Sequence, residues 1–122
     1  MEQIKEIINW NIIANNNNYN PELEKAMLTE ELNETIEAIN NNDRIEILDW
    51  VIDLFFVWVG TLHKLWFTPE QIEEALDLII ENNLSKFHYE NWKYTCIRNE
   101  AGKIIKPEWF IKVNLDNLWN II

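Results

Sequence analysis

The chain has 122 residues, of which 48% are hydrophobic, so it is long enough for one domain with a real core and is not a disordered chain. Only two Gly, three Pro and one Cys are present, which argues against a turn-rich all-β protein and excludes an internal disulfide framework. The net charge of −11 argues against non-specific binding to nucleic acid.

The longest apolar stretch, residues 50–62, is shorter than the ~20 residues that a bilayer-spanning helix needs, and it contains Asp53. The first six residues lack the basic-then-apolar order of a signal peptide. We therefore expect a cytoplasmic protein with no membrane partner and no nucleic-acid polymer as partner. The charge is uneven, because residues 1–85 carry a net −13 and residues 86–122 a net +2.

Apolar residues at helical spacing predict four helices over about residues 2–14, 20–39, 43–65 and 68–87. Asn20 before Pro21 is a typical N-cap followed by Pro at the first helical position. Asp43 and Glu46 have the spacing of a capping box, and Thr68, Pro69 and Gln71 repeat these signals. The Asn runs after the first two helices are interpreted as loop residues.

The third predicted helix is apolar nearly all round, which indicates burial on every side. A small monomer offers too little surface for this burial, so we expect a homodimer or a homotetramer. Gly60 within this helix is expected to allow another helix to approach closely.

The C-terminal part is expected to hold a short hairpin, formed by residues 93–97 and 103–105 with Gly102 in the turn. Residues 115–122 are expected to form a last helical turn. The predicted fold class is therefore all-α: a four-helix bundle with a short C-terminal hairpin and tail. We expect a single domain over residues 1–122, with a helical core at about 2–87 and a basic tail at about 88–122.

Acidic residues cluster on the second and third predicted helices. An ionised Asp53 among its apolar neighbours would cost several kcal/mol without a partner. Because a short loop makes the two helices antiparallel neighbours, their acids should lie at similar heights. Mg²⁺ prefers such oxygen ligands, so the pattern suggests a divalent cation held between the helices by acids at these positions: Glu30, Glu31, Glu34, Glu37, Glu46, Asp49 and Asp53.

Simpler roles remain open for most of these acids. Glu37 suits a solvated surface acid, Glu46 a capping-box residue, and Glu30 and Glu31 ordinary surface acids. Asp49 would equally pair with Arg44 or Lys64 of a neighbouring chain. A di-iron carboxylate bundle is excluded, because neither His63 nor His88 has a Glu three residues before it.

The chain resembles a known family in four segments. The acidic signatures at residues 30–34 and 49–54 resemble those of the all-α nucleoside triphosphate pyrophosphohydrolases, which include the MazG-like, phosphoribosyl-ATP pyrophosphohydrolase-like and dimeric dUTPase-like proteins. The Asn-x-Ser-Lys segment ending at Lys86 and the Gly-Lys-x-x-Lys-Pro segment at 102–107 resemble elements of the small, phage-type branch. One departure is that Trp50 stands where many MazG-like proteins carry Glu, three residues before the position of Asp53.

The resemblance implies Mg²⁺-dependent hydrolysis of a (deoxy)nucleoside triphosphate to the monophosphate and pyrophosphate, with Mn²⁺ able to substitute. It implies that Glu31, Glu34, Asp49 and Asp53 hold metal, with Glu46 as an additional outer ligand. Glu30 would help to deprotonate the attacking water. The phosphates would be bound by residues of the fourth helix and the tail, namely Asn83, Lys86, Lys103 and Lys106.

Two other functions stay open from the sequence. One is a non-catalytic helical module of the same fold that senses nucleotides or binds proteins, which the departure at Trp50 allows. The other is a purely structural bundle without metal.

Overall fold

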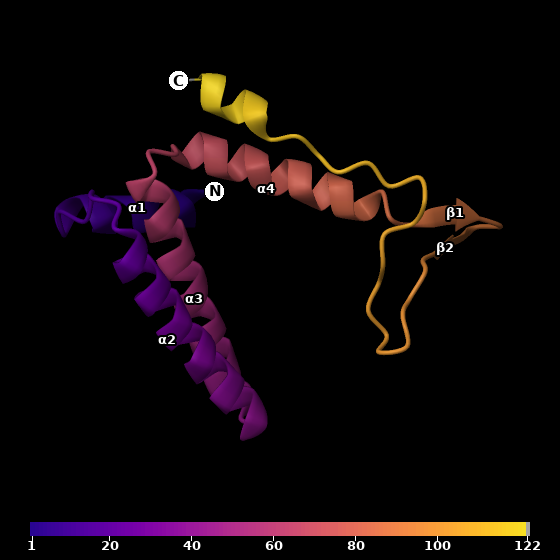
Figure 1. Ribbon diagram of the computed structural model, residues 1–122, viewed down its shortest axis with the longest axis horizontal. Coiled ribbons are helices and arrows are strands. Elements are labelled where there is room, and N and C mark those ends of the chain that lie inside the picture. Colours follow the sequence, from indigo (N-terminus) through magenta and orange to yellow (C-terminus); the bar gives the residue numbers. More distant parts are fainter. Residues whose placement is uncertain (122) are drawn as a thin grey trace. The chain divides into compact units, whose positions relative to one another are not determined.

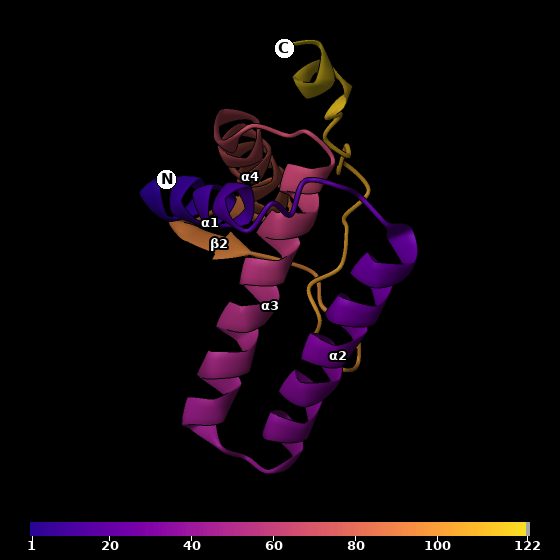
Figure 2. The same ribbon diagram turned by 90° about the vertical axis from the view of Figure 1, so that its left-hand side faces the viewer.

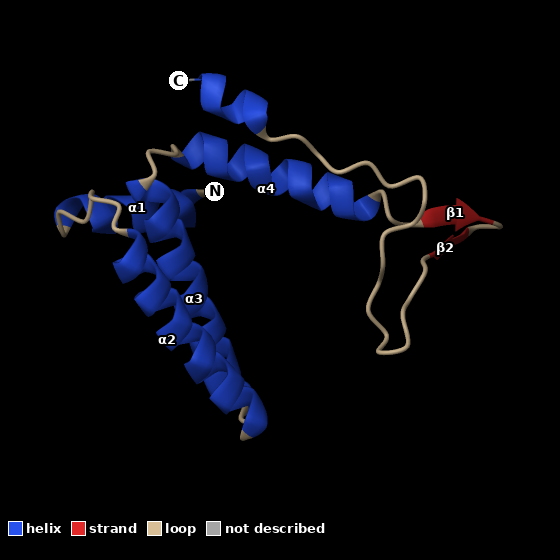
Figure 3. Cartoon of the chain, in the orientation of Figure 1, coloured by secondary structure: helices blue, strands red, loops and turns tan. Residues whose placement is uncertain are grey.

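The computed structural model describes the backbone of residues 1–121 and the side chains of residues 1–118. Helices dominate this part of the chain, and the strands are short (Figure 3). The predicted all-α class is confirmed. Contacts divide the chain into two compact units, Met1–Pro69 and Glu70–Ile122. None of the helices within residues 1–121 is both long and apolar enough to cross a bilayer.

The first unit is built from three helices: α1 Glu2–Ile13, α2 Pro21–Asn40 and α3 Arg44–Lys64. The two long helices α2 and α3 run antiparallel beside each other, joined by the link 41–43 (Figure 2). Two of the predicted N-caps, Asn20 and Asp43, are confirmed. The Asn20 side chain accepts from the N–H of Glu22 at 3.1 Å. The Asp43 side chain accepts from the N–H of Ile45 at 3.2 Å and from that of Glu46 at 3.1 Å.

The Asn runs do more than fill loops. Asn15 and Asn42 adopt positive φ angles of 61° and 54° just after the C-caps of α1 and α2. In the second case the N–H of Asn42 donates to the carbonyl of Ile39 at 3.0 Å, and the N–H of Asp43 donates to that of Ala38 at 3.2 Å. This pair of bonds is a Schellman motif, and Asn is one of the few residues that adopt its left-handed position readily.

Helix α1 (indigo in Figure 1) lies against α3 at Gly60. A Cβ atom on Gly60 would stand 3.3 Å from both polar side-chain atoms of Asn11, so the missing side chain permits this contact. The expected close helix approach at Gly60 is confirmed. Next to it, Trp10 meets Phe56 edge-to-face with ring centroids 5.0 Å apart. Ile4 and Val59 are the largest fully buried side chains of this core.

The single chain does not bury α3 on every side, and the expected burial of its remaining apolar positions in an oligomer stays a prediction. Ile45, Leu48 and Ile52 are 72%, 59% and 55% exposed. The reason is that α3 has only two helical neighbours in the first unit, α1 and α2. Each covers one side, so the remaining apolar positions of α3 face outward.

The second unit contains α4 (Pro69–Leu84, whose first residue closes the first unit), β1 (His88–Glu90) and β2 (Lys93–Thr95). The strands pair antiparallel, with Tyr89 opposite Tyr94. Asn91 and Trp92 join them with positive φ angles of 52° and 64°, as a two-residue type I′ turn requires. The predicted hairpin of 93–97 with 103–105 is confirmed only beside its turn, where the N–H of Ile105 donates to the carbonyl of Ile97 at 2.8 Å. Residues 93–95 pair instead with the preceding residues 88–90.

Only one bridge of the predicted hairpin forms, between Arg98 and Ile104. Gly102 lies in its turn with φ 87°, as predicted. The chain then returns along α4 and ends in a short 3₁₀ helix, η1 (Asp116–Ile121) (Figure 1). The expected last helical turn at 115–122 takes this form, and residue 122 lies outside the described residues. Gln71, expected as a capping-box residue, is 4% exposed and donates to the carbonyl of Leu118 at 2.7 Å.

Candidate functional site

Four of the predicted metal ligands stand on the two long helices of the first unit. Glu31 and Glu34 are half-buried on α2, and Asp49 and Asp53 stand on α3. Partial burial raises the pKa of Glu31, and the charges of Asp53, Glu34, Glu30 and Asp49 raise it further. The charges of Asp49 and Asp53 on α3 act on Glu31 of α2, which agrees with the expectation that the acids of the two antiparallel helices lie at similar heights.

The pKa of Glu34 is raised by the same kinds of effect. The largest cause is the loss of water around the carboxyl, and the charges of Glu30, Glu37 and Asp53 raise the pKa further. One carboxyl oxygen of Glu31 and one of Glu34 are buried without a hydrogen-bond partner. Such oxygens are unfavourable unless something positive binds them. The group is therefore a cluster of carboxyls that repel one another, and two of its buried oxygens lack hydrogen-bond donors.

The raised pKa values predict how stability depends on pH. Between the ordinary pKa of 4.5 and the raised folded values, the folded chain binds more protons at Glu31 and Glu34 than the unfolded chain does. The contribution of these two groups to the free energy of unfolding therefore falls as the pH rises through this window. We expect the double variant Glu31→Gln/Glu34→Gln to be more stable than the wild type at pH 7 without divalent cation, with a gap that narrows as pH falls toward 4.5.

Urea denaturation at a series of pH values measures this gap. The matched control is Glu70→Gln/Glu74→Gln, which removes two carboxyls from α4 in the second unit. It accounts for the general effect of lowering the net charge of −11. A gap between the Glu31/Glu34 variant and this control that widens on acidification would contradict the assignment.

The carboxyl cluster fits a divalent cation by its donor chemistry. Hard oxygen donors, and buried ones without partners, are what Mg²⁺ and Mn²⁺ bind. In residues 1–121, however, no three His, Cys, Asp or Glu side chains converge closely enough to hold a metal as they stand. The expectation that little water surrounds Asp53 is wrong, because Asp53 is exposed in the single chain. Glu30 and Glu46 are also exposed.

A cavity of about 130 Å³ lies one helical turn from the acids, between α1, α2 and α3. Met27, four residues before Glu31, and Val57, four residues after Asp53, line it on the two long helices. Trp10 and Phe56 provide aromatic edges, and the rest of its lining is polar or small: Asn11, Asn16, Gly60 and Lys64. The cavity is mostly apolar with a few polar groups, as ligand sites are, but it is smaller than the roughly 300–1,000 Å³ of typical ligand pockets.

A buried ion pair adjoins this cavity, and sequence reasoning missed it. Lys64 on α3 donates to Glu24 on α2 at 2.9 Å, and the two side chains are only 7% and 4% exposed. Thr61 donates to the same carboxyl oxygen at 3.0 Å. The one available signal was that Glu24 lies seven residues before Glu31, on the same stripe of α2. The partners stand 40 residues apart, so no local pattern could pair them.

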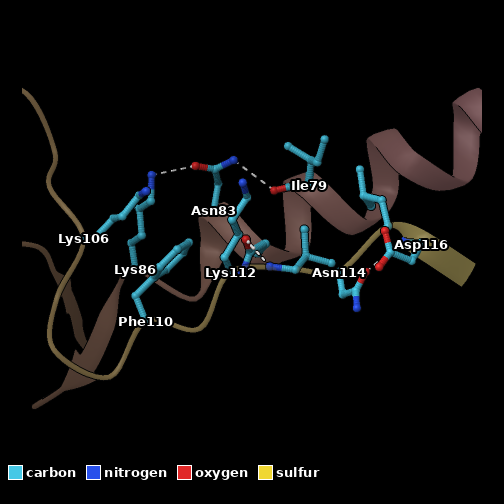
Figure 4. Close-up of a pocket in the computed structure, with 11 residues that line it drawn as sticks. Ile79, Asn83, Lys86, Lys106, Phe110, Lys112, Asn114 and Asp116 are labelled. Carbon is cyan, nitrogen blue, oxygen red and sulfur yellow. Dashed lines mark hydrogen bonds between the residues drawn. The ribbon is translucent and has the colours of Figure 1, made fainter.

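The second unit gathers most of the predicted phosphate-binding residues. Asn83, Lys86 and Lys106 line one pocket of about 560 Å³ between α4 and the returning chain (Figure 4). Lys103 does not line it, because its residue belongs to the turn, where its N–H donates to Asn99. Lys112 also lines the pocket, and sequence reasoning overlooked it. Its basic charge within a basic tail was the only signal.

These observations describe an all-α protein whose antiparallel helix pair presents a repelling carboxyl cluster beside a small cavity. The chain belongs to the phosphoribosyl-ATP pyrophosphohydrolase family, whose model matches residues 3–78. The match covers α1, α2, α3 and most of α4, so it includes every predicted acid. The MazG-like superfamily expected from the acidic signatures is thereby confirmed, and with it a pyrophosphohydrolase that acts on an acid anhydride. Comparison with curated proteins and with solved structures gave no match.

Proposed function

We propose that the protein is a Mg²⁺-dependent pyrophosphohydrolase that cleaves a (deoxy)nucleoside triphosphate to the monophosphate and pyrophosphate. The observation that carries the proposal is the carboxyl cluster on α2 and α3, in which buried oxygens of Glu31 and Glu34 lack donors while neighbouring acids raise their pKa. We propose that this cluster is the cation site of the protein. A structural role alone does not account for the repulsion.

The metal would be held by Glu31, Glu34, Asp49 and Asp53, with Glu46 as an additional outer ligand. When bound, a divalent cation supplies positive charge for the phosphates and Lewis acidity toward water. Its binding also turns the mutual repulsion of the carboxyls into attraction toward one centre. The exposed position of Asp49 and Asp53 leaves their side chains free to rotate toward such a centre.

The chemistry is an in-line displacement at the α-phosphorus. A water oxygen forms the new bond to phosphorus, the bond to the bridging oxygen breaks, and pyrophosphate leaves with that electron pair. Glu30 is exposed and adjoins Glu31 on α2, so we assign to it the proton of the attacking water. Asn83, Lys86 and Lys106 bind phosphate oxygens, and Lys103 adds charge from the turn.

The 130 Å³ cavity is proposed to receive the base. A cavity of about 150 Å³ binds one benzene molecule, so this one suits a single six-membered ring better than a fused purine. Trp10 and Phe56 offer apolar edges for such a ring, and Asn11 and Asn16 offer amides for its polar substituents. We therefore propose a pyrimidine nucleotide as the preferred substrate.

We further propose that two copies associate through α2 and α3. Exposed apolar residues form a stripe on each helix: Leu32, Ile36 and Ile39 on α2, and Ile45, Leu48 and Ile52 on α3. Their spacing of three and four residues keeps each stripe on one helix face. A second copy of the same helix pair would bury both stripes, which a monomer leaves in water.

Pyrophosphate release from a set of nucleotides tests the proposed activity. The set contains dCTP, dUTP, dTTP, dATP and dGTP, together with the phosphoribosyl-ATP that the family is named after, each with and without Mg²⁺. We expect turnover that needs the cation and is faster for the pyrimidines. The activity is rejected if no nucleotide is consumed although Mg²⁺ raises the melting temperature, which shows that the metal site is filled.

A non-catalytic nucleotide sensor of the same fold is the second candidate. The observations in its favour are Trp50 at a position where an acid is expected and the lack of a ready three-ligand group in residues 1–121. Isothermal titration calorimetry distinguishes a sensor from an enzyme. A sensor gives a heat of binding for nucleotide and cation without a continuing heat of hydrolysis, and the nucleotide remains intact.

A further inference from the structure

Three lysines surround the pocket of the second unit. Lys86 comes from the end of α4, and Lys106 and Lys112 come from the strap, defined as residues 106–116, which runs back along that helix (Figure 4). Asp116 is the one acid among the residues that line this pocket. Three like charges around one space of about 560 Å³ repel one another, and a bound anion would offset this cost.

Phe110 contacts two of the three lysines through its ring. The ammonium groups of Lys86 and Lys106 lie 5.5 Å and 5.7 Å from the centre of its ring. Each contact is a favourable cation–π interaction. Lys86 also donates to the side-chain oxygen of Asn83 at 2.8 Å, and Asn83 in turn donates to the carbonyl of Ile79 at 2.9 Å. The ring and the amide therefore hold ammonium groups in place before any ligand arrives.

Asn82 fixes the third lysine. Its side-chain N–H donates to the carbonyl of Ile111 at 2.7 Å, and its side-chain oxygen accepts from the N–H of Val113 at 3.0 Å. The two bonds grip the strap on either side of Lys112. Trp109 adds a third attachment by donating to the carbonyl of Ser85 at 3.0 Å. One amide on α4 thus sets the backbone position from which Lys112 extends.

We propose that this pocket binds a diphosphate or triphosphate anion through Lys86, Lys106 and Lys112, and that Asn82 is the positioning residue for Lys112. The inference rests on the proposed function for the origin of the anion, since pyrophosphate is the product of that reaction. The binding itself needs neither catalysis nor the carboxyl cluster. The pocket is formed wholly by residues of the second unit.

The test is calorimetric titration of the full chain with inorganic pyrophosphate in the presence of a chelator. We expect wild type and Asp53→Asn to bind equally, and Lys112→Met to bind about tenfold more weakly, as the loss of one charge-assisted contact implies. The matched control is Lys93→Met, which removes the same charge from exposed β2 outside the pocket and should leave binding unchanged. Equal binding by Lys112→Met and wild type, or no binding by the wild type, would overturn the proposal.

A double-mutant cycle tests the role of Asn82. Asn82→Ala should weaken pyrophosphate binding about as much as Lys112→Met, and the double variant should lose little more, because both changes remove the same contact. Fully additive losses would refute positioning and indicate a separate effect on the fold. The two proposals can fail separately. If no nucleotide is hydrolysed but pyrophosphate still binds through the lysines, only the proposed function is rejected. If nucleotide is hydrolysed but pyrophosphate binding does not depend on the lysines, only the pyrophosphate site is rejected.

Discussion

Asp53→Asn is expected to lower kcat/KM for the best nucleotide by about 1,000-fold or more. The substitution keeps the shape of the side chain and removes one charge from the proposed cation site. Lewis-acid stabilisation by a bound metal supplies several kcal/mol to the transition state, and each 1.36 kcal/mol corresponds to a factor of ten in rate. Steady-state pyrophosphate release at saturating Mg²⁺ measures the loss.

The same substitution should leave the fold intact. The charge of Asp53 raises the pKa of both Glu31 and Glu34, so its removal relieves repulsion in the folded chain. We therefore expect a melting temperature equal to or above that of the wild type without cation, and a smaller rise on addition of Mg²⁺. The matched control is Asp77→Asn, the same change on exposed α4, which should keep wild-type rates. An Asp53→Asn variant that retains full activity would refute the ligand assignment.

Local signals in the sequence located the helices well. Asn20 and Asp43 cap α2 and α3 as their residue types predict, since a short side-chain oxygen satisfies N–H groups that the first turn leaves free. The antiparallel register of the acids also followed from sequence, because the short link leaves two long helices only one way to pack. Contacts of this kind depend on residues close in the chain.

The contacts of the C-terminal part were harder to predict from the sequence, because they do not follow from such local signals. Residues 93–95 carry strand character, but their partner was set by whether Asn91 and Trp92 would accept positive φ angles. A Trp in that conformation is rare, and no local signal favours it. The grip of Asn82 on the strap joins residues about 30 positions apart, and that too has no local pattern.

Asp53 is exposed, although most of its neighbours in sequence are apolar. Apolar neighbours in sequence indicated a buried carboxyl, yet Val51 and Ile52 are 44% and 55% exposed, whereas Leu54 on the other side of Asp53 is buried. Burial depends on what covers a helix, and the first unit supplies two helical neighbours for α3, namely α1 and α2. The apolar character of α3 therefore predicts a surface that a second copy would cover, and it does not by itself predict the surroundings of one residue within the monomer.

Lys64→Met should have the largest effect on stability, lowering the free energy of unfolding by about 3–5 kcal/mol. Lys64 is the charged partner of Glu24, and the two side chains are 7% and 4% exposed. One oxygen of Glu24 already lacks a partner, so the variant would leave a buried carboxylate with only the Thr61 hydroxyl as donor. Thermal unfolding should show a fall of roughly 10–20 °C.

Two further variants establish that the cost comes from the unpaired charge. Lys25→Met removes the lysine next to Glu24 in sequence, whose partner Glu22 is 83% exposed, and an exposed pair of this kind contributes at most about 1 kcal/mol. The double variant Glu24→Gln/Lys64→Met should regain most of the loss, because replacing both charges of a buried pair is often neutral. If the double variant were as unstable as Lys64→Met alone, the loss would come from the packing of the lysine stem, and the ion pair would not be its cause.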